Sequence, residues 1–226
     1  GYEALQANTT ANDNIAVGLK SLRSNTTGSQ NVGVGVSALY SNTTAANNTA
    51  VGYKALLNNT TGERNTAMGA YSADSVTGGD FNSAFGYNAL GANTTGTHNT
   101  ALGDTSLAAN TTTNHNTAVG QGALQSNTAA ANTAVGSAAL NQNSTGTNNV
   151  AVGYQALDAN TTASGCTAVG KDSLTASNAN NNSAFGRTSL YANTTGTNNT
   201  GLGVNALYAN TTGSNCTAVG LSALEQ

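Results

Sequence analysis

A seventeen-residue pattern of apolar and polar positions repeats along the chain. In the copy Asn48–Arg64, whose residues we number 1 to 17, Asn-Thr-Ala-Val leads to a glycine at position 5, and Ala-Leu follows at positions 8 and 9. Such a fixed period predicts one structural unit stacked many times. The glycine of position 5 recurs every 17 residues, apart from two intervals of 16, at Gly18, Gly35, Gly52, Gly69, Gly86, Gly103, Gly120, Gly136, Gly153, Gly170, Gly186, Gly203 and Gly220.

Positions 1 to 4 predict a short β-strand, because they favour β-structure and a glycine follows them. Positions 2 and 4 then point to one face of the strand and position 3 to the other. Since position 4 is always large and apolar, we expect it inside the coil together with the leucine of position 9. The predicted core therefore includes Val51, Leu56, Val119, Leu124, Val152 and Leu157.

Asn-Thr-Thr-Gly at positions 12 to 15 predicts a corner and interrupts the apolar spacing that a helix needs. Seventeen residues at roughly 3.3 Å each give a circuit of about 56 Å, which suits one turn of a narrow parallel β-solenoid. We therefore expect an all-β fold, a parallel β-solenoid (β-helix or β-roll) with one repeat per coil and about 13 coils. It is expected to run as a single continuous solenoid over residues 1–226.

Two columns of the repeat carry further predictions. Stacked identical amides at position 1 can form a hydrogen-bonded ladder along the axis, which places Asn48, Asn65, Asn82, Asn99 and Asn116 in one column. Position 3 is only Ala or Gly, so something must approach it closely: another chain, the next coil's backbone, or a flat exposed face. This close-contact column includes Ala50, Ala67, Ala101, Ala118 and Ala151.

One leucine and one valine per coil make a thin core. We therefore expect lateral association into a homotrimer, with the Ala/Gly column at or near the symmetry axis; a narrow monomer is the alternative. Both ends of the sequence fall in mid-repeat, which favours a segment of a longer fibre and allows end-to-end stacking into a filament.

Composition narrows the classes of function. Charged residues make up 7% of the chain and the net charge is −3, so the basic surface that nucleic-acid binding requires is missing. Since no apolar run approaches the roughly 20 residues of a membrane span, membrane insertion is not expected. We find no catalytic constellation, phosphate-binding motif, metal-ligand cluster or cofactor signature, and we do not expect an enzyme.

The stretch Asn149-Val150-Ala151-Val152-Gly153-Tyr154-Gln155-Ala156-Leu157, with Asn-Thr-Thr-Gly, resembles the repeats of bacteriophage tail-fibre proteins. It is more distantly similar to the head repeats of trimeric autotransporter adhesins, which carry Ser-Val-Ala-Ile-Gly strands. The resemblance extends over the whole chain, although the period is longer than that of the adhesin heads. It implies a trimeric, extracellular, cell-surface or virion-borne β-solenoid that serves in adhesion or as a shaft, with a cell-surface glycan as a possible ligand.

Smaller motifs each have two interpretations. Cys166 and Cys216 replace the position-1 asparagine; they are expected roughly 14 Å apart, too far for a disulfide, and are either buried substitutes or sites of an interchain bond. His98 and His115 are either metal ligands or solvated loop residues; we expect the second, because they have no Cys or carboxylate partners. Tyrosines at positions 6 and 10 are either partly buried surface residues or a ladder for glycans or a lateral contact.

Asn-Thr-Thr triplets match the acceptor pattern for N-glycosylation, but a corner consensus produces the same triplets. We interpret them as structural; their asparagines include Asn8, Asn25, Asn59, Asn93, Asn110, Asn160, Asn193 and Asn210. One copy departs from the pattern, with Ala73 in the leucine column and Val76 in the asparagine column. Phe81 and Phe85 are candidates to fill the missing volume.

The leading functional hypothesis is a structural and adhesive segment of an extracellular fibre, in which stacked hydrogen bonds and a continuous core hold binding parts away from a surface. The second hypothesis is an ice-binding solenoid that presents threonine columns at positions 13 and 14. Adjacent threonines tend to face opposite sides, which argues against this second hypothesis.

Overall fold

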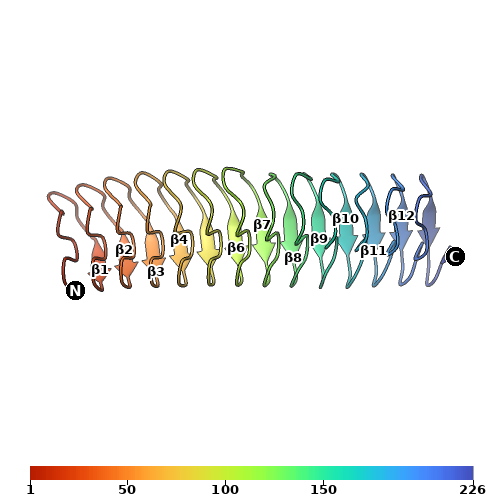
Figure 1. Ribbon diagram of the computed structural model, residues 1–226, viewed down its shortest axis with the longest axis horizontal. Coiled ribbons are helices and arrows are strands. Elements are labelled where there is room, and N and C mark those ends of the chain that lie inside the picture. Colours follow the sequence, from red (N-terminus) through yellow and green to blue (C-terminus); the bar gives the residue numbers. More distant parts are fainter. Residues whose placement is uncertain (226) are drawn as a thin grey trace. The chain divides into compact units, whose positions relative to one another are not determined.

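The computed structural model describes residues 1–225, which form two compact units, residues 1–115 and residues 116–225. Within each unit the chain winds as a parallel β-solenoid, with one repeat per coil (Figure 1). The predicted fold class is therefore confirmed. The expectation of one continuous solenoid stays a prediction, and the two units are described separately.

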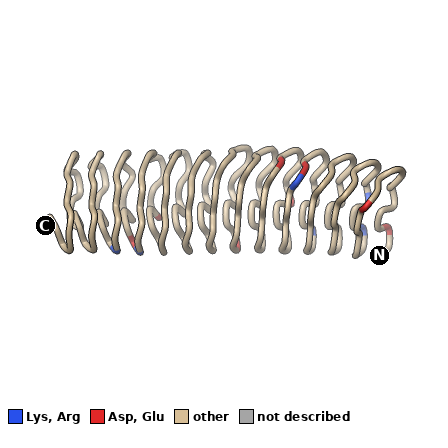
Figure 2. The backbone as a smooth tube through the Cα atoms, turned by 180° about the vertical axis from the view of Figure 1, so that it is seen from behind, with Lys and Arg blue, Asp and Glu red and all other residues tan. Residues whose placement is uncertain are grey.

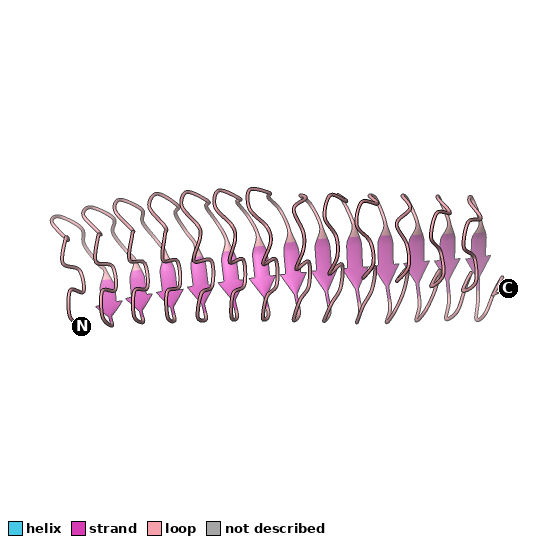
Figure 3. Cartoon of the chain, in the orientation of Figure 1, coloured by secondary structure: helices cyan, strands magenta, loops and turns pink. Residues whose placement is uncertain are grey.

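Each coil contributes one three-residue strand, and turns and loops make up the rest of the coil (Figure 3). Within each unit neighbouring strands pair in parallel with equal repeat positions in register, as in Val32 with Thr49 and Val34 with Val51. Residues 1–225 contain no helix. The N-terminal unit holds β1 (Ile15–Val17), β2 (Val32–Val34), β3 (Thr49–Val51), β4 (Thr66–Met68), β5 (Ser83–Phe85) and β6 (Thr100–Leu102). The C-terminal unit holds β7 (Thr117–Val119), β8 (Thr133–Val135), β9 (Val150–Val152), β10 (Thr167–Val169), β11 (Ser183–Phe185), β12 (Thr200–Leu202) and β13 (Thr217–Val219).

The glycine at position 5 turns the chain after each strand. Gly52 has φ +139°, and a Cβ built there would lie 2.5 Å from the carbonyl oxygen of Gly69 in the next coil. L-residues with a side chain rarely adopt this backbone conformation, and the neighbouring coil leaves no room for a side chain. Glycine is therefore required at position 5 for two independent reasons.

Three further residues per coil adopt left-handed conformations although they carry side chains. In one coil these are Lys54, Leu56 and Arg64, with φ of 57°, 49° and 56°. Each such residue costs roughly 1–2 kcal/mol. Hydrogen bonds between coils oppose this cost: the Lys54 N–H donates to Val36 O at 3.0 Å and the Leu56 N–H to Ser72 O at 3.1 Å. The coil shape thus depends on its neighbours in the stack.

The core of each unit is lined by leucine on one wall and by alanine or glycine on the strand wall. Leu56, Leu124 and Leu157 are fully buried, as predicted. The residues of position 3 are buried as well, and Ala50, Ala67, Ala101, Ala118 and Ala151 have no exposed surface. The expectation that a close neighbour explains the small size of this column is confirmed.

The predicted place of the position-4 residues in the core is wrong. Val51 and Val119 are only half-buried and Val152 is 36% exposed, because positions 2 and 4 point away from the coil. The physical reason is that the interior of the coil is too narrow for a large side chain on the strand wall. At Gly33 of the strand wall, an added Cβ would lie 2.5 Å from Ser21 Oγ and 3.4 Å from Leu22 Cγ on the opposite wall. A coil this narrow has room for at most a methyl group opposite its leucine.

This packing also corrects the placement of the Ala/Gly column at a symmetry axis. The neighbour that approaches position 3 is the opposite wall of the same chain, as the contacts at Gly33 and at Gly201 show in the two units. Ser189 Oγ donates to the Gly201 carbonyl oxygen at 3.1 Å and occupies the place of a methyl group there. A symmetry axis through this column is therefore excluded.

The coil that contains Ala73 and Val76 departs from the repeat and leaves buried polar atoms without hydrogen-bond partners. Both residues are fully buried. Val76 offers no amide, so Asn59 Oδ1 has no hydrogen-bond donor, and Ser72 Oγ is buried without a partner. The expectation that Phe81 and Phe85 fill the core is wrong: Phe81 is 43% exposed, and Phe85 lies at an outward position of β5.

Replacing Val76 with asparagine is expected to stabilise the N-terminal unit by about 1 kcal/mol. The new amide can donate to Asn59 Oδ1, and an unmet buried acceptor costs about 1–3 kcal/mol. Denaturant-induced unfolding of the two proteins measures the difference. The reverse change, Asn93→Val in the next coil, serves as the control and is expected to destabilise the unit. Equal or lower stability of Val76→Asn would disprove the explanation.

Candidate functional site

Asparagines at position 1 form the predicted ladder inside each unit. The Asn48 N–H donates to Asn31 Oδ1 at 2.9 Å, and the Asn48 Nδ2 donates to Gly62 O at 2.8 Å. Asn48 Oδ1 in turn accepts the N–H of Asn65 at 2.9 Å. Every buried polar atom of the side chain is thus paired, and the column stabilises the stack. The predicted residues Asn48, Asn65, Asn82, Asn99 and Asn116 are all at most 1% exposed.

The asparagines of the Asn-Thr-Thr triplets form a second ladder at position 12. Asn42 Nδ2 donates to Asn25 Oδ1 at 2.8 Å and to Ala45 O at 3.0 Å. Asn25, Asn93 and Asn160 are among the members without exposed surface. Glycosylation needs an accessible amide nitrogen. The interpretation of these triplets as structural is therefore confirmed for the buried members.

The two cysteines are free thiols in position 1 of the C-terminal unit. Cys166 is fully buried, and its Sγ lies 3.2 Å from Ala179 O. Burial raises the pKa of the Cys166 thiol, and the nearby N–H groups of Asn182 and Asn181 oppose this shift. Cys166 is therefore a buried substitute for asparagine. Cys216 is partly exposed, and an interchain bond at Cys216 stays a prediction.

The outward positions 2 and 4 give each unit an exposed apolar surface. We call this surface the outer strand face. In the N-terminal unit it includes Met68 and Leu102, which are 42% and 47% exposed. In the C-terminal unit it includes Val152 and Leu202, which are 36% and 48% exposed. The outer strand face consists of Ile15, Val17, Val32, Val34, Thr49, Val51, Thr66, Met68, Ser83, Phe85, Thr100 and Leu102 in the first unit, and of Thr117, Val119, Thr133, Val135, Val150, Val152, Thr167, Val169, Ser183, Phe185, Thr200, Leu202, Thr217 and Val219 in the second.

The outer strand face carries no charged residue in either unit. The few Lys, Arg, Asp and Glu of the described chain lie in the loops and turns, and most of the tube in Figure 2 is tan. Sheet surfaces that remain in water usually carry charges that prevent pairing with other chains. This uncharged row of exposed Val, Leu, Met and Phe is therefore the candidate site for contacts with other molecules.

Aromatic side chains gather in three places on the turns. In the N-terminal unit Tyr71 contacts both Tyr53 and Tyr87. The exposed His98 stacks between Phe81 and His115, with ring centroids 4.8 and 5.2 Å away. In the C-terminal unit the rings of Tyr191 and Tyr208 stack at 5.3 Å, as expected for a column at position 10.

Within residues 1–225 no pocket is detected and no group of three or more potential metal ligands occurs. In the same residues no helix has the length and apolarity needed to cross a bilayer. The candidate sites described above are extended surfaces along the coils. Sequence reasoning missed the outer strand face because it placed positions 2 and 4 inside, and it missed the contact between Tyr71, at position 7, and the tyrosines at position 6.

The stacked coils define a parallel β-solenoid protein with an uncharged, apolar outer strand face. A scan against protein-family models and searches of curated proteins and of solved structures found no match to this chain. The functional conclusion below therefore depends on the geometry of the surface and on the character of the repeat.

Proposed function

We propose that the chain is a structural segment of an extracellular fibre in which three copies associate through their outer strand faces. The chain acts mechanically: hydrogen bonds between coils and the two asparagine ladders make a stiff spacer that holds adhesive parts away from a surface. The observation that carries the proposal is the exposed, uncharged row of large apolar residues on both units. Burying this row against other copies removes apolar surface from water.

Three further features support the proposal. The core of a single coil is narrow, so a lateral partner adds apolar contacts that the coil cannot make alone. The repeat resembles those of tail-fibre proteins and of trimeric adhesin heads, which favours three copies and a cell-surface or virion location. The scarcity of charge on the strands removes the repulsion that would keep copies apart.

Charge placed on the outer strand face tests this proposal. We expect Met68→Lys, Leu102→Lys, Val152→Lys and Leu202→Lys, combined in one chain, to convert the trimer to a monomer, because four ammonium groups cannot be buried unpaired. Native mass is measured by light scattering, and circular dichroism checks the fold. The mutated side chains are all at least 36% exposed in one chain, so the coils themselves are expected to fold.

A second quadruple variant is the matched control. Thr61, Thr95, Thr145 and Thr195 are exposed at position 14, away from the strands. Changing these four to lysine adds the same charge and is expected to leave the trimer intact. Loss of the trimer in both variants would show that net charge, and not the outer strand face, controls association. An intact trimer in both variants would likewise contradict the role of the outer strand face.

Ice binding is the second candidate, and the structure changes which threonines it would use. Hydroxyls at position 13 are occupied, since Thr26 Oγ1 donates to Thr43 O at 3.0 Å and Thr60 Oγ1 donates to Thr77 O at 2.9 Å. Threonines at position 2, in contrast, point outward beside the valines of position 4. A flat Thr-x-Val surface open to solvent would favour this function. Thermal hysteresis of the solution is the measurement, and its absence eliminates the candidate.

A further inference from the structure

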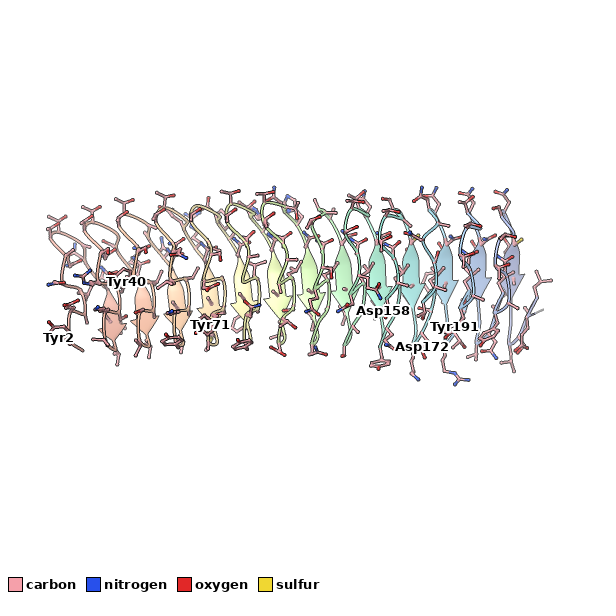
Figure 4. All side chains as sticks on the ribbon, in the orientation of Figure 1. Tyr2, Tyr40, Tyr71, Asp158, Asp172 and Tyr191 are labelled. Atoms are coloured by element: carbon pink, nitrogen blue, oxygen red, sulfur yellow. The ribbon has the colours of Figure 1, made fainter. Side chains whose placement is uncertain are left out.

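Three tyrosines in the N-terminal unit form a cluster just after the strands, with the central ring of Tyr71 half-buried. Tyr53, Tyr71 and Tyr87 follow β3, β4 and β5, and Figure 4 marks Tyr71 in this row. We call these three residues the tyrosine cluster. Tyr71 meets Tyr53 at a centroid distance of 5.3 Å and Tyr87 at 5.9 Å, with interplanar angles of 84° and 80°. Tyr53 is 43% exposed and Tyr87 is 56% exposed.

The perpendicular arrangement distinguishes the tyrosine cluster from the other aromatic contacts. Tyr191 and Tyr208 lie almost parallel, at 5°, and Phe81 and His98 at 19°. In a stacked pair both rings lose one face to the partner, whereas in an edge-to-face contact one of the two rings loses only its edge. Tyr87 is the most exposed ring of the cluster, at 56%, and offers its surface to a ligand.

Lys54 adds a positive charge to the tyrosine cluster. Its Nζ lies 5.2 Å from the ring centroid of Tyr53 and 5.7 Å from that of Tyr71. In the described part of the chain the ion pairs are Arg23 with Glu3 and Lys171 with Asp172, so the Lys54 ammonium lacks a carboxylate within 4.0 Å. Asp74 interacts with Lys54 electrostatically from a greater distance. A ligand carboxylate can therefore pair with Lys54 directly.

We propose that the tyrosine cluster and Lys54 bind an acidic glycan. The apolar face of a pyranose ring packs on the exposed ring of Tyr87, and a uronate carboxylate of the same chain pairs with the Lys54 ammonium. No pocket is detected in residues 1–225, which favours an extended polysaccharide lying along the turns over a small enclosed molecule. This binding goes beyond the proposed fibre function and uses residues outside the outer strand face.

Two matched probes test the proposal: tetragalacturonic acid and its fully methyl-esterified form, which lacks the charge. Eight tyrosines and no tryptophan allow binding to be followed by tyrosine emission, with calorimetry as the second readout. Tyr87→Ala is expected to weaken binding of both probes about tenfold. Lys54→Gln is expected to weaken binding of the acid about threefold to tenfold and to leave the ester unchanged.

Tyr191→Ala is the control, because it removes a tyrosine from a stacked pair in the other unit. We expect it to bind both probes as the unmodified protein does. The proposal is overturned if the protein binds neither probe at millimolar concentration, if Tyr87→Ala and Lys54→Gln both bind the acid normally, or if Tyr191→Ala loses as much affinity as Tyr87→Ala. Native mass measured on the same samples reports fibre assembly separately, so failure of one proposal is distinguishable from failure of the other.

Discussion

Gly52→Ala is expected to destabilise the N-terminal unit by about 3 kcal/mol. The new side chain would have to adopt the φ of +139° at this position and would lie 2.5 Å from the Gly69 carbonyl oxygen. Relief of that clash requires the two coils to separate, which weakens hydrogen bonds such as that from the Gly69 N–H to Val51 O, now 2.8 Å. Because the coils depend on their neighbours, the damage is expected to spread beyond one repeat.

Gly78→Ala in the same unit is the control. Gly78 lies at position 14, where other coils carry threonine, and the nearest atom to an added Cβ is Thr61 Oγ1 at 3.2 Å. This variant is expected to change the free energy of unfolding by less than about 1 kcal/mol. Chemical unfolding followed by circular dichroism compares the two. Equal stability of the two variants would show that position 5 does not need glycine.

Leu56→Ala is expected to cost about 2–5 kcal/mol, the usual range for a leucine removed from a packed core. Leu56 has no exposed surface, and the small residues of the strand wall cannot expand into the space it leaves. The adjacent Leu57 is only half-buried. Leu57→Ala, the same chemical change one residue along, is therefore expected to cost less than about 1.5 kcal/mol.

Thermal and denaturant unfolding of the two leucine variants measure this difference. A large loss in Leu56→Ala with a small loss in Leu57→Ala supports a core centred on position 9. Similar losses in both variants would contradict that core. The test is independent of the outer strand face, because neither leucine belongs to it.

The period, the fold class and the leucine column could be predicted because stacked coils place equal positions in register, so any structural role reappears every 17 residues. The leucine of position 9, such as Leu56, recurs in a column that is apolar throughout and therefore buried. The asparagine of position 1, such as Asn48, recurs in a column whose amides can form hydrogen bonds from coil to coil. These inferences depend on repetition alone, and the hydrogen bonds of Asn48 confirm them.

The side of the strand that faces inward could not be predicted in this way. Alternation places Thr49 and Val51 together and opposite Ala50, but it does not say which set lies inside. The larger apolar side chain predicted that Val51 faces the interior. The coil is too narrow for a valine there, so Ala50 faces the interior instead. That width depends on the left-handed turns at Lys54, Leu56 and Arg64, which are residues without any preference for such backbone.

The strand turns its large apolar residues outward, opposite to the prediction. This strengthens the proposal of assembly, and it places the proposed interface on positions 2 and 4 instead of position 3. The predicted contact through Ala50 is buried within one chain, whereas Val51 and its equivalents are available to a partner. The tyrosine cluster follows the same strands but lies beyond Gly52, on the turn. A fibre built on the outer strand face can therefore keep Tyr87 open to a glycan.

Sedimentation equilibrium of the unmodified chain over a wide range of concentration tests the central claim most directly. Association through the outer strand face predicts a particle of about three times the 22.2 kDa of one chain. Such a particle is expected to persist at high salt, since the buried surface is apolar and uncharged. A single species with the mass of one chain at every concentration would contradict the account.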